Sequence, residues 1–212
     1  MILAAGRGVR LQPLTLQRPK PLIRIGTDSL ILHLLKRLDM DSRNISRVVI
    51  NVGYLGEQII TALKEYRFHF EIKYSIEPQT PLGTAAGIRK ALPLLGSEPF
   101  LCISADIWTD FIFSKLCAIP IDLGHLVLIK KPCSWLKGDF KLAGEDFIYG
   151  NIAVLHPQLL LADSKEEALG PLLKWALKEG RCSKEIYDGR WHNVGDARTL
   201  AKVRGEHLAH NL

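Results

Sequence analysis

Residues 1–21, MILAAGRGVRLQPLTLQRPKP, contain the pattern that decides the fold. Residues 1–5 form a short apolar run that ends at a glycine, which predicts a buried strand. Gly6 and Gly8 carry no Cβ, so the backbone after that strand can turn tightly and approach a ligand closely. Three cations lie on or just after the turn: Arg7, Arg10 and Lys20. Backbone N–H groups of a glycine turn, together with fixed cations, suit a polyphosphate.

The loop after this strand differs from the two common nucleotide-binding loops. In a dinucleotide-binding fingerprint the glycine turn opens directly into a helix. Here three prolines disfavour an uninterrupted helix: Pro13, Pro19 and Pro21. Asp28 stands where a ribose-binding acid could lie, but it precedes the first helical pattern instead of ending a second strand. The Walker sequence G-x-x-x-x-G-K-[ST] is absent. We therefore expect an extended, proline-stiffened loop that ends in Lys20.

Strand and helix patterns alternate after the loop. The strands are expected at 47–52, 70–74 and 99–104, and the helices at 30–38 (after Ser29 as a cap), 55–66 and 83–95. That order predicts an α/β, Rossmann-like, doubly wound and mostly parallel sheet. Strands then follow at 126–129, 139–142 and 148–155 with no helix between them, which predicts a small antiparallel extension. A helix at 168–178, a short strand at 190–195 and a helix from Asp196 to His207 complete the prediction.

Composition limits the class of protein. The chain has 212 residues, 47% of them hydrophobic, which suits one domain over residues 1–212. Its formal charge of +6 is scattered, with no basic run among aromatics, so small anionic substrates fit better than a nucleic acid. No apolar run is long enough to span a membrane or to act as a signal peptide. The cysteines Cys102, Cys117, Cys133 and Cys182 form no C-x-x-C pair, which favours the reducing cytoplasm.

Asp106 is the second residue that indicates chemistry. It follows the predicted strand at 99–104, and ligands of open α/β sheets bind at the carboxyl ends of strands. A carboxylate opposite a polyphosphate loop can hold Mg²⁺, which prefers one or two carboxylates plus phosphate oxygens. The alternative is an aspartate that only caps a turn or helix. The histidines at 33, 69, 125 and 156 have no matched partners in the sequence, so we expect structural roles and neither a triad nor a zinc site.

Several motifs together resemble the sugar-1-phosphate nucleotidyltransferases. The loop supplies Leu3-Ala4-Ala5-Gly6-x-Gly8-x-Arg10, Pro13-Leu14-Thr15 and Pro19-Lys20-Pro21, and later come Ser104-x-Asp106 and Glu77-Pro78-x-x-Pro81-Leu82-Gly83-Thr84-Ala85-Ala86-Gly87. The resemblance implies an Mg²⁺-dependent enzyme acting on an NTP and a sugar 1-phosphate. It implies nucleotide binding by Leu3, Ala4, Ala5, Gly6, Arg7, Gly8, Val9, Arg10, Lys20, Gly83 and Thr84. It also implies that Lys20 would contact the α-phosphate and the incoming phosphate, and that Arg10 would contact the β- and γ-phosphates. Asp106 would bind the metal ion.

The segment Trp191-His192-Asn193-Val194-Gly195-Asp196 departs from the family pattern. The family carries a second metal-binding aspartate where Asn193 stands here. An amide oxygen can ligate Mg²⁺, but it should bind more weakly without a full negative charge. Asp196 could be imagined as a substitute ligand, yet it fits better as the N-cap of the helix that follows. The expected metal residues are therefore Asp106 and Asn193.

Later stretches are similar to a branch of this family that transfers a uridylyl group to N-acetylmuramate 1-phosphate. That similarity implies that residues 1–117 bind the nucleotide, and that residues 118–212 bind the acceptor, with Ser104, Gly138 and Asn151 facing the sugar. The hairpin between Leu142 and Tyr149 is shorter than in that branch, which leaves other sugar phosphates open, and the motif at 77–87 does not fix the base, so guanylyl or other nucleotidyl transfer stays open. A nucleotide-binding relative without turnover is the alternative of another class, and a basic nucleic-acid binder comes last. We expect a monomer.

Overall fold

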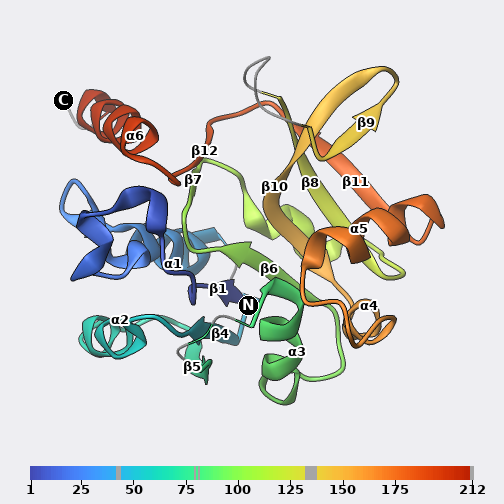
Figure 1. Ribbon diagram of the computed structural model, residues 1–212, viewed down its shortest axis with the longest axis horizontal. Helices are drawn as coiled ribbons and strands as arrows, with labels where there is room; N and C mark the ends of the chain where they lie inside the picture. The colour runs from blue at the N-terminus through green and yellow to red at the C-terminus, as the bar shows by residue number, and fades with distance from the viewer. Residues whose placement is uncertain (42–43, 79, 81, 132–137, 211–212) are drawn as a thin grey trace.

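The computed structural model describes residues 1–41, 44–78, 80, 82–131 and 138–210 (Figure 1). Pro81 and Cys133, named above, lie outside these ranges. The main sheet has the strand order β11-β8-β10-β6-β1-β4-β5, and β9 pairs with β10 beside this path. These strands are β1 (Ile2–Leu3), β4 (Arg47–Val52), β5 (Glu71–Ile76), β6 (Phe100–Ser104), β8 (Gly124–Lys130), β9 (Phe140–Leu142), β10 (Glu145–Leu155) and β11 (Cys182–Tyr187).

The expected division between parallel and antiparallel strands is confirmed. Strands β5, β4, β1 and β6 run parallel to one another, with Ile2 paired to both Ile50 and Ile103. Strand β10 is antiparallel to β6, β8 and β9. The hairpin between β9 and β10 turns through Ala143 and Gly144, both at positive φ, as a tight two-residue hairpin turn requires. The chain thus has an α/β, mostly parallel sheet with a small antiparallel extension.

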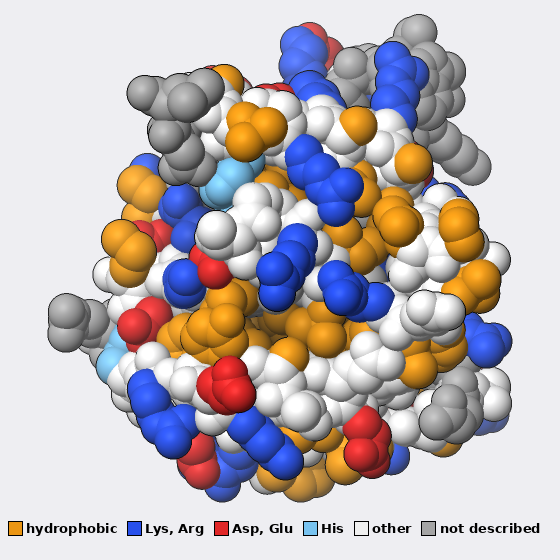
Figure 2. All heavy atoms as spheres, turned by 90° about the vertical axis from the view of Figure 1, so that its left-hand side faces the viewer, with side chains coloured by type: hydrophobic (Ala, Val, Ile, Leu, Met, Phe, Trp, Pro, Cys, Tyr) orange, Lys and Arg blue, Asp and Glu red, His pale blue; other side chains and the backbone are white. Residues whose placement is uncertain are grey.

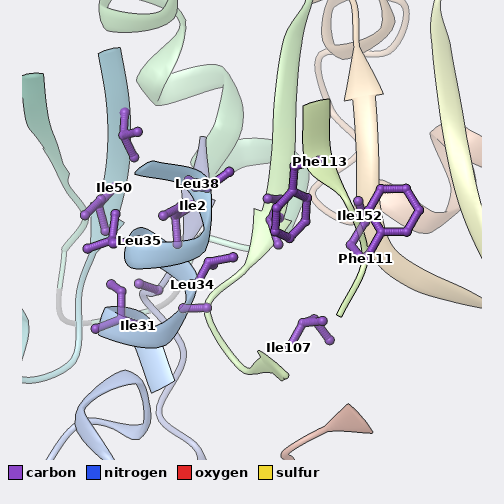
Figure 3. Packing of buried hydrophobic residues seen from close by; sticks show 14 of the residues in the cluster. Ile2, Ile31, Leu34, Leu35, Leu38, Ile50, Ile107, Phe111, Phe113 and Ile152 are labelled. Carbon is purple, nitrogen blue, oxygen red and sulfur yellow. The ribbon is translucent and has the colours of Figure 1, made fainter. Parts of the chain in front are cut away.

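Helices cover both faces of the sheet. They are α1 (Leu30–Asp41), α2 (Gly56–Leu63), α3 (Thr84–Leu95), α4 (Pro157–Leu161) and α5 (Leu169–Lys178), whereas α6 (Ala197–His210) packs in a separate core. One core joins α1 and α2 to Ile2, Ile50 and Ile103, and the other joins α3, α4 and α5 to Val49 and Cys102. Neighbouring strand residues point to opposite cores because side chains alternate along a strand. Figure 3 shows the first core, where Ile31, Leu34 and Leu35 of α1 lie against Ile2 and Ile50.

The signature loop, residues 6–22, is more compact than the expected extended loop. It winds through three short 3₁₀ helices, Val9–Leu11, Leu14–Leu16 and Lys20–Leu22. The prolines block an α-helix but allow such single turns, since each turn needs only one or two backbone hydrogen bonds. Leu11 and Ile23 then pack with Leu200 and Val203 of α6 in a third core, so the C-terminal helix supports the loop.

Some short or polar elements were not predicted. Two small sheets pair β2 (Arg24–Ile25) with β3 (Asp28–Ser29), and β7 (Ile107–Thr109) with β12 (Trp191–Asn193). Strand β12 lies within the short strand expected at 190–195, whereas β2, β3 and β7 were not expected. Ser29 thus lies in a strand just before α1. Strand β11 was missed because it lies at the edge of the sheet and most of its side chains are exposed or half-buried, so it lacks an apolar run. Helix α4 spans five residues, too few for a helical period to be visible.

His125 gives the fold a pH dependence. It is buried in β8, with Nδ1 2.8 Å from Ser183 Oγ and Nε2 3.8 Å from Glu185 Oε1. Burial lowers the pKa of His125, although Glu185 partly opposes this effect. A lowered pKa means that the folded state disfavours the protonated ring, so this contribution to stability is present above the ordinary pKa of about 6.5 and is lost as pH falls below it.

We therefore expect wild-type protein to lose more stability between pH 7.5 and pH 5.5 than a His125→Gln variant. Urea unfolding at the two pH values measures the difference directly. An equal loss in both proteins would mean that His125 does not contribute to the pH dependence.

Candidate active site

A pocket of about 350 Å³ opens at the carboxyl ends of the parallel strands. Its lining contains most of the residues expected to bind the nucleotide, together with several that the sequence did not indicate. The lining residues are Leu3, Ala4, Ala5, Gly6, Gly8, Val9, Arg10, Lys20, Pro21, Asn51, Glu77, Gly83, Thr84, Ser104, Ala105, Asp106 and Gly195. Four different strands deliver these residues to one edge of the sheet, as expected for a ligand site of an open α/β fold.

The glycine turn has the geometry that its residues predict. Gly8 has φ of +63°, in the left-handed region that favours glycine. A Cβ at this position would lie 3.0 Å from Lys20 Cβ and 3.1 Å from Thr15 Cγ2. The hydroxyl of Thr15 donates to the carbonyl oxygen of Gly8 at 2.9 Å. The turn is therefore packed directly against the segment that carries Lys20.

Lys20 and Asp106 form an ion pair between Nζ and Oδ2. The sequence predicted one residue for phosphate and the other for metal, and the structure brings them into direct contact. Both side chains are largely shielded from solvent, with 12% of the Lys20 side chain and 22% of the Asp106 side chain exposed. Each charge neutralises the other in the absence of substrates. Nucleotide and metal would have to replace this pairing when they bind.

Two oxygens beside this pair have no hydrogen-bond partner. Asp106 Oδ1 and Asn193 Oδ1 are both buried, and neither meets a donor in the part of the chain that the structure describes. They lie near each other because Asn193 pairs with Ile107 in the β7–β12 ladder, and the N–H of Val194 donates to the carbonyl oxygen of Asp106 at 2.9 Å. Buried acceptors without a donor are costly unless a cation or water satisfies them.

This oxygen pair fits Mg²⁺. The ion takes one or two protein oxygens and completes its shell with water and phosphate oxygens. Among the described residues, no group of three or more His, Cys, Asp or Glu side chains could hold a metal. If Asp106 and Asn193 held Mg²⁺, they would supply two oxygens and leave most coordination positions to substrate and water.

If Asn193 contributes to metal binding, then Asn193→Asp should lower the Mg²⁺ concentration that gives half-maximal activity. A full negative charge would replace a neutral amide oxygen at the same position, and hard cations bind carboxylates more strongly. Magnesium titrations of wild type and variant at saturating substrates give both midpoints. An identical midpoint would remove Asn193 from the metal site.

Asp196 is the predicted helix cap. Its Oδ1 accepts a hydrogen bond from the N–H of Thr199 at 2.8 Å, at the start of α6. That backbone hydrogen bond is the main cause that lowers the pKa of Asp196, and Arg10 contributes less. Arg10 also lies against Gly195, where a Cβ would come within 2.9 Å of Arg10 Nη2. The segment after Asn193 therefore holds the guanidinium of Arg10 at the edge of the pocket.

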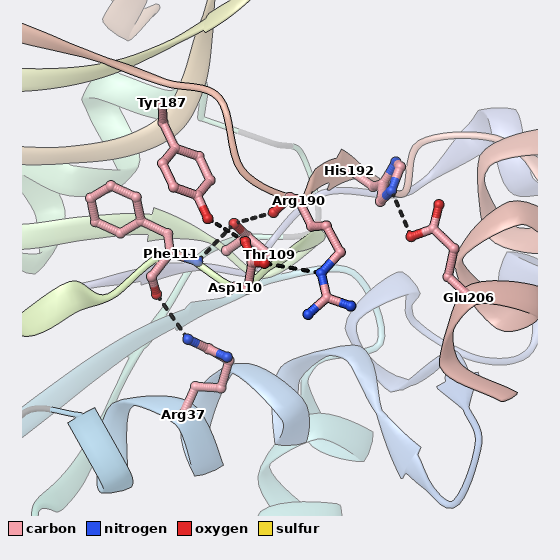
Figure 4. A network of polar contacts seen from close by, with 8 residues as sticks. All are labelled: Arg37, Thr109, Asp110, Phe111, Tyr187, Arg190, His192 and Glu206. Carbon is pink, nitrogen blue, oxygen red and sulfur yellow. Dashed lines mark hydrogen bonds and ion pairs between the residues drawn. The ribbon is translucent and has the colours of Figure 1, made fainter. Parts of the chain in front are cut away.

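A polar network surrounds the pair of strands β7 and β12 (Figure 4). Tyr187 and Arg190 both donate to Asp110, and His192 lies 3.0 Å from Glu206 of α6. Burial alone would raise the pKa of Asp110, but the hydrogen bonds from Tyr187 and Arg190 outweigh it and the pKa is lowered. Strand β12 is thus anchored at both ends of its short ladder.

Asn51 is a functional candidate that the sequence analysis missed, and Glu77 was quoted there within a family motif but not as a binding residue. Both are buried and line the pocket, and Asn51 Nδ2 donates to Glu77 Oε1. Asn51 Oδ1 also accepts from the N–H of Ala4 at 2.7 Å. A Cβ at Gly87 of α3 would lie 2.3 Å from Glu77 Oε1, so the helix approaches this carboxylate closely. A polar residue inside the apolar strand RVVINV was the signal that could have found Asn51.

The three residues expected to face the sugar do not all lie at the pocket. Ser104 lines it. Asn151 is not among the lining residues, but it lies on the neighbouring strand β10, directly before Ile152, which pairs with Ile103 of β6. Asn151 has φ of +55° where the register of β10 shifts, and such bulges redirect side chains near functional sites. Gly138 lies elsewhere, against Asp146. Its role, and that of Arg7, which is not among the lining residues, stay predictions.

The neighbouring face carries many cations. Figure 2 looks onto the side of the molecule that Figure 1 shows at its left, with the signature loop, α2 and α6, and Lys and Arg side chains gather there around a hollow with a hydrophobic floor. A cavity of about 510 Å³ lies between the loop and α2, lined by Arg18, Arg24, Leu22 and Leu63 among others.

None of the described helices is both long and apolar enough to cross a lipid bilayer.

The fold and the pocket define a nucleotidyl transferase, and comparison with known proteins agrees. The family model for nucleotidyl transferases matches residues 1–131, so the chain belongs to this family, as a sugar-1-phosphate nucleotidyltransferase. N-acetylmuramate alpha-1-phosphate uridylyltransferase of Neisseria meningitidis serogroup B is 34% identical over 96% of this chain and 96% of its own length.

Two further comparisons concern parts of the chain or the fold alone. Mannose-1-phosphate guanyltransferase of Aspergillus oryzae is 36% identical over 120 aligned residues. The alignment covers 55% of this chain and 32% of that relative. The crystal structure of a candidate glucose-1-phosphate thymidylyltransferase from Bacillus anthracis, in complex with sucrose, has a TM-score of 0.84. It covers 100% of this chain and 94% of its own at 16% identity, which supports the fold.

Proposed function

We propose that the protein transfers a uridylyl group from UTP to N-acetylmuramate 1-phosphate, releasing pyrophosphate and forming the nucleotide sugar. One observation carries the nucleotidyl-transfer part of the proposal: the glycine turn, Arg10, Lys20 and Asp106 line one pocket, and Lys20 pairs with Asp106 there. The likeness to the Neisseria enzyme along nearly the whole chain supports the choice of base and sugar. The product is a cell-wall nucleotide sugar, so we place the reaction in the reuse of peptidoglycan.

The reaction needs no nucleophile from the protein. A sugar 1-phosphate is largely dianionic at neutral pH, because its second pKa is about 6. One of its phosphate oxygens attacks the α-phosphorus of the NTP, the bond to the β-phosphate breaks, and pyrophosphate carries away that electron pair. The enzyme must hold two anions together and in line, so positioning and charge neutralisation dominate catalysis.

The pocket residues divide this task. The Nζ of Lys20, already beside the metal carboxylate, would leave Asp106 for the α-phosphate and the incoming phosphate. Arg10 would hold the β- and γ-phosphates, with the N–H groups of the glycine turn behind them. Asp106 and Asn193 would hold Mg²⁺, which neutralises phosphate charge and aligns the phosphate oxygens when bound. Ser104 and Asn151 would contact the acceptor sugar, and Gly83 and Thr84 the nucleoside.

Glu77 favours a second candidate, guanylyl transfer. Guanine presents two adjacent N–H donors on its Watson–Crick edge, whereas uracil presents one N–H between two carbonyl oxygens. A buried carboxylate in the nucleotide pocket therefore complements guanine better than uracil. The similarity of 55% of this chain to mannose-1-phosphate guanyltransferase of Aspergillus oryzae supports the same candidate.

Mass spectrometry of the products separates the two candidates. Each of the four common NTPs is incubated with Mg²⁺ and, in turn, with N-acetylmuramate 1-phosphate, N-acetylglucosamine 1-phosphate, glucose 1-phosphate and mannose 1-phosphate. The first proposal expects UDP-N-acetylmuramate as the main product. A guanosine diphosphate sugar as the main product would replace it with the second candidate, and nucleotide binding without any product would favour a non-catalytic relative.

We further propose that residues 1–212 act as one domain and as a monomer in the cytoplasm. Residues 1–117 would bind the nucleotide and residues 118–212 the acceptor, apart from Ser104 of the first half, which lines the pocket. We expect small-molecule substrates, and neither nucleic acid nor membrane as partners. Sedimentation at micromolar concentration tests the monomer, and a dimer would contradict it.

A further inference from the structure

We propose that Tyr54, which lies outside every motif of the sequence, is a positioning residue that holds the signature loop in its nucleotide-binding shape. Tyr54 lies two residues after the end of β4, and β4 is the strand next to β1 in the sheet. Its backbone N–H donates to the carbonyl oxygen of Ala5 at 3.4 Å, directly before the glycine turn. Tyr54 thus meets the loop at the point where the loop leaves the sheet.

The side chain of Tyr54 reaches the far arm of the same loop. Its hydroxyl lies 3.1 Å from the carbonyl oxygen of Thr15 and 3.1 Å from that of Leu16, so its single proton is shared between them. The neighbouring Gln58 adds a hydrogen bond from Nε2 to the carbonyl oxygen of Gln17 at 3.0 Å. One tyrosine therefore ties together both arms of the loop, and a glutamine of α2 reinforces the second arm.

The ring of Tyr54 also holds one of the loop cations. Arg7 Cζ lies 5.3 Å from the ring centroid, a cation–π contact. Arg7 stands between Gly6 and Gly8, so a guanidinium held on this ring also restrains the glycine turn. The ring and the hydroxyl act on different parts of the loop, the ring on the turn and the hydroxyl on residues 15–16.

This anchoring determines where Lys20 lies. Thr15 donates to Gly8, and Gly8 packs against Lys20, so the segment that Tyr54 holds is in contact with the turn and with the lysine. Without the hydroxyl the loop can sample more conformations, and the nucleotide must then select the binding shape from them. The apparent affinity falls in proportion to the population that is lost.

Tyr54→Phe tests the hydroxyl while keeping the ring for Arg7. Tyr66→Phe is the matched control, since it makes the same chemical change at an exposed tyrosine three residues after α2, where no hydrogen bond from its hydroxyl to the loop is seen among the described residues. We expect Tyr54→Phe to raise the Kd for the NTP and Mg²⁺, measured without acceptor, about tenfold over the control. Global unfolding midpoints should agree, and Tyr54→Leu should weaken binding further because Arg7 loses its ring.

Hydrogen exchange of the nucleotide-free protein gives a second measurement that does not depend on which base or sugar the enzyme uses. Amides of residues 8–17 should exchange faster in Tyr54→Phe than in Tyr66→Phe, with the strands β1 and β4 unchanged. Equal exchange in this segment together with equal Kd values would overturn the role of Tyr54. The proposal rests on nucleotide use by this pocket, and a wrong base or sugar would instead appear as missing products with wild-type enzyme.

Discussion

Lys20→Ala should reduce turnover by at least about 10²–10³-fold, the loss typical when one preorganised donor to a developing charge is removed. Lys20 is the cation most deeply placed in the pocket, and its Nζ is already aimed at the metal carboxylate. No other lysine lines the pocket among the described residues. Two anions would then meet at the α-phosphate without this charge between them, so the rate of transfer falls more than nucleotide binding does.

The matched control for this prediction is Lys36→Ala. Lys36 also pairs with an aspartate, Asp28, but its side chain is 48% exposed on α1. Pyrophosphate release at saturating substrates compares the two variants, and urea unfolding checks the fold. We expect both variants to fold like wild type, because Asp106 keeps contact with solvent after its partner is removed. A Lys20→Ala variant as active as Lys36→Ala would exclude Lys20 from the chemistry.

Asp106→Asn should have the second large effect, a loss of about 10²-fold or more that excess Mg²⁺ restores only in part. The change keeps the shape of the side chain and removes its charge, leaving two neutral amides at the proposed metal site. Electrostatic stabilisation by a bound cation amounts to several kcal/mol in the transition state, and each 1.36 kcal/mol is a factor of ten in rate.

Magnesium titration of Asp106→Asn, with Asp122→Asn as control, measures this effect. Asp122 is a surface aspartate paired with Arg181, and its side chain is 52% exposed. The half-saturating Mg²⁺ concentration should rise for the first variant and stay unchanged for the second. Wild-type activity and an unchanged midpoint in Asp106→Asn would mean that this carboxylate does not bind the metal.

Much of the fold was predictable because the deciding patterns are local. The apolar strands at 47–52 and 99–104 and the helices between them follow from side-chain period alone, and the mostly parallel sheet follows from their alternation. The cap at Asp196 was equally predictable, since a short acceptor side chain before a helical pattern satisfies the first free N–H groups. Strand β11 was not, because an edge strand with mostly exposed side chains has no apolar run.

The site residues also divide into those that local sequence patterns predict and those that they do not. Motif spacing predicted the residues of the glycine turn, Lys20 and Asp106, and the structure collects them in one pocket. The hydrogen bond between Asn51 and Glu77 and the anchor at Tyr54 join segments distant in sequence, so local patterns do not reveal these contacts, although the polar Asn51 in an apolar strand was a signal. The compact winding of the signature loop also depends on tertiary contacts, since Leu11 packs against the C-terminal helix.

Pyrophosphate release from UTP, N-acetylmuramate 1-phosphate and Mg²⁺, compared between wild type and Asp106→Ala, tests most directly whether this pocket performs nucleotidyl transfer. Omission of the sugar phosphate provides the blank for simple hydrolysis. We predict rapid release by wild type only when all three components are present, and almost none with Asp106→Ala. Nucleotide binding by wild type without release from any NTP and sugar 1-phosphate, or equal release by Asp106→Ala, would contradict the assignment of this pocket as a metal-assisted transfer site.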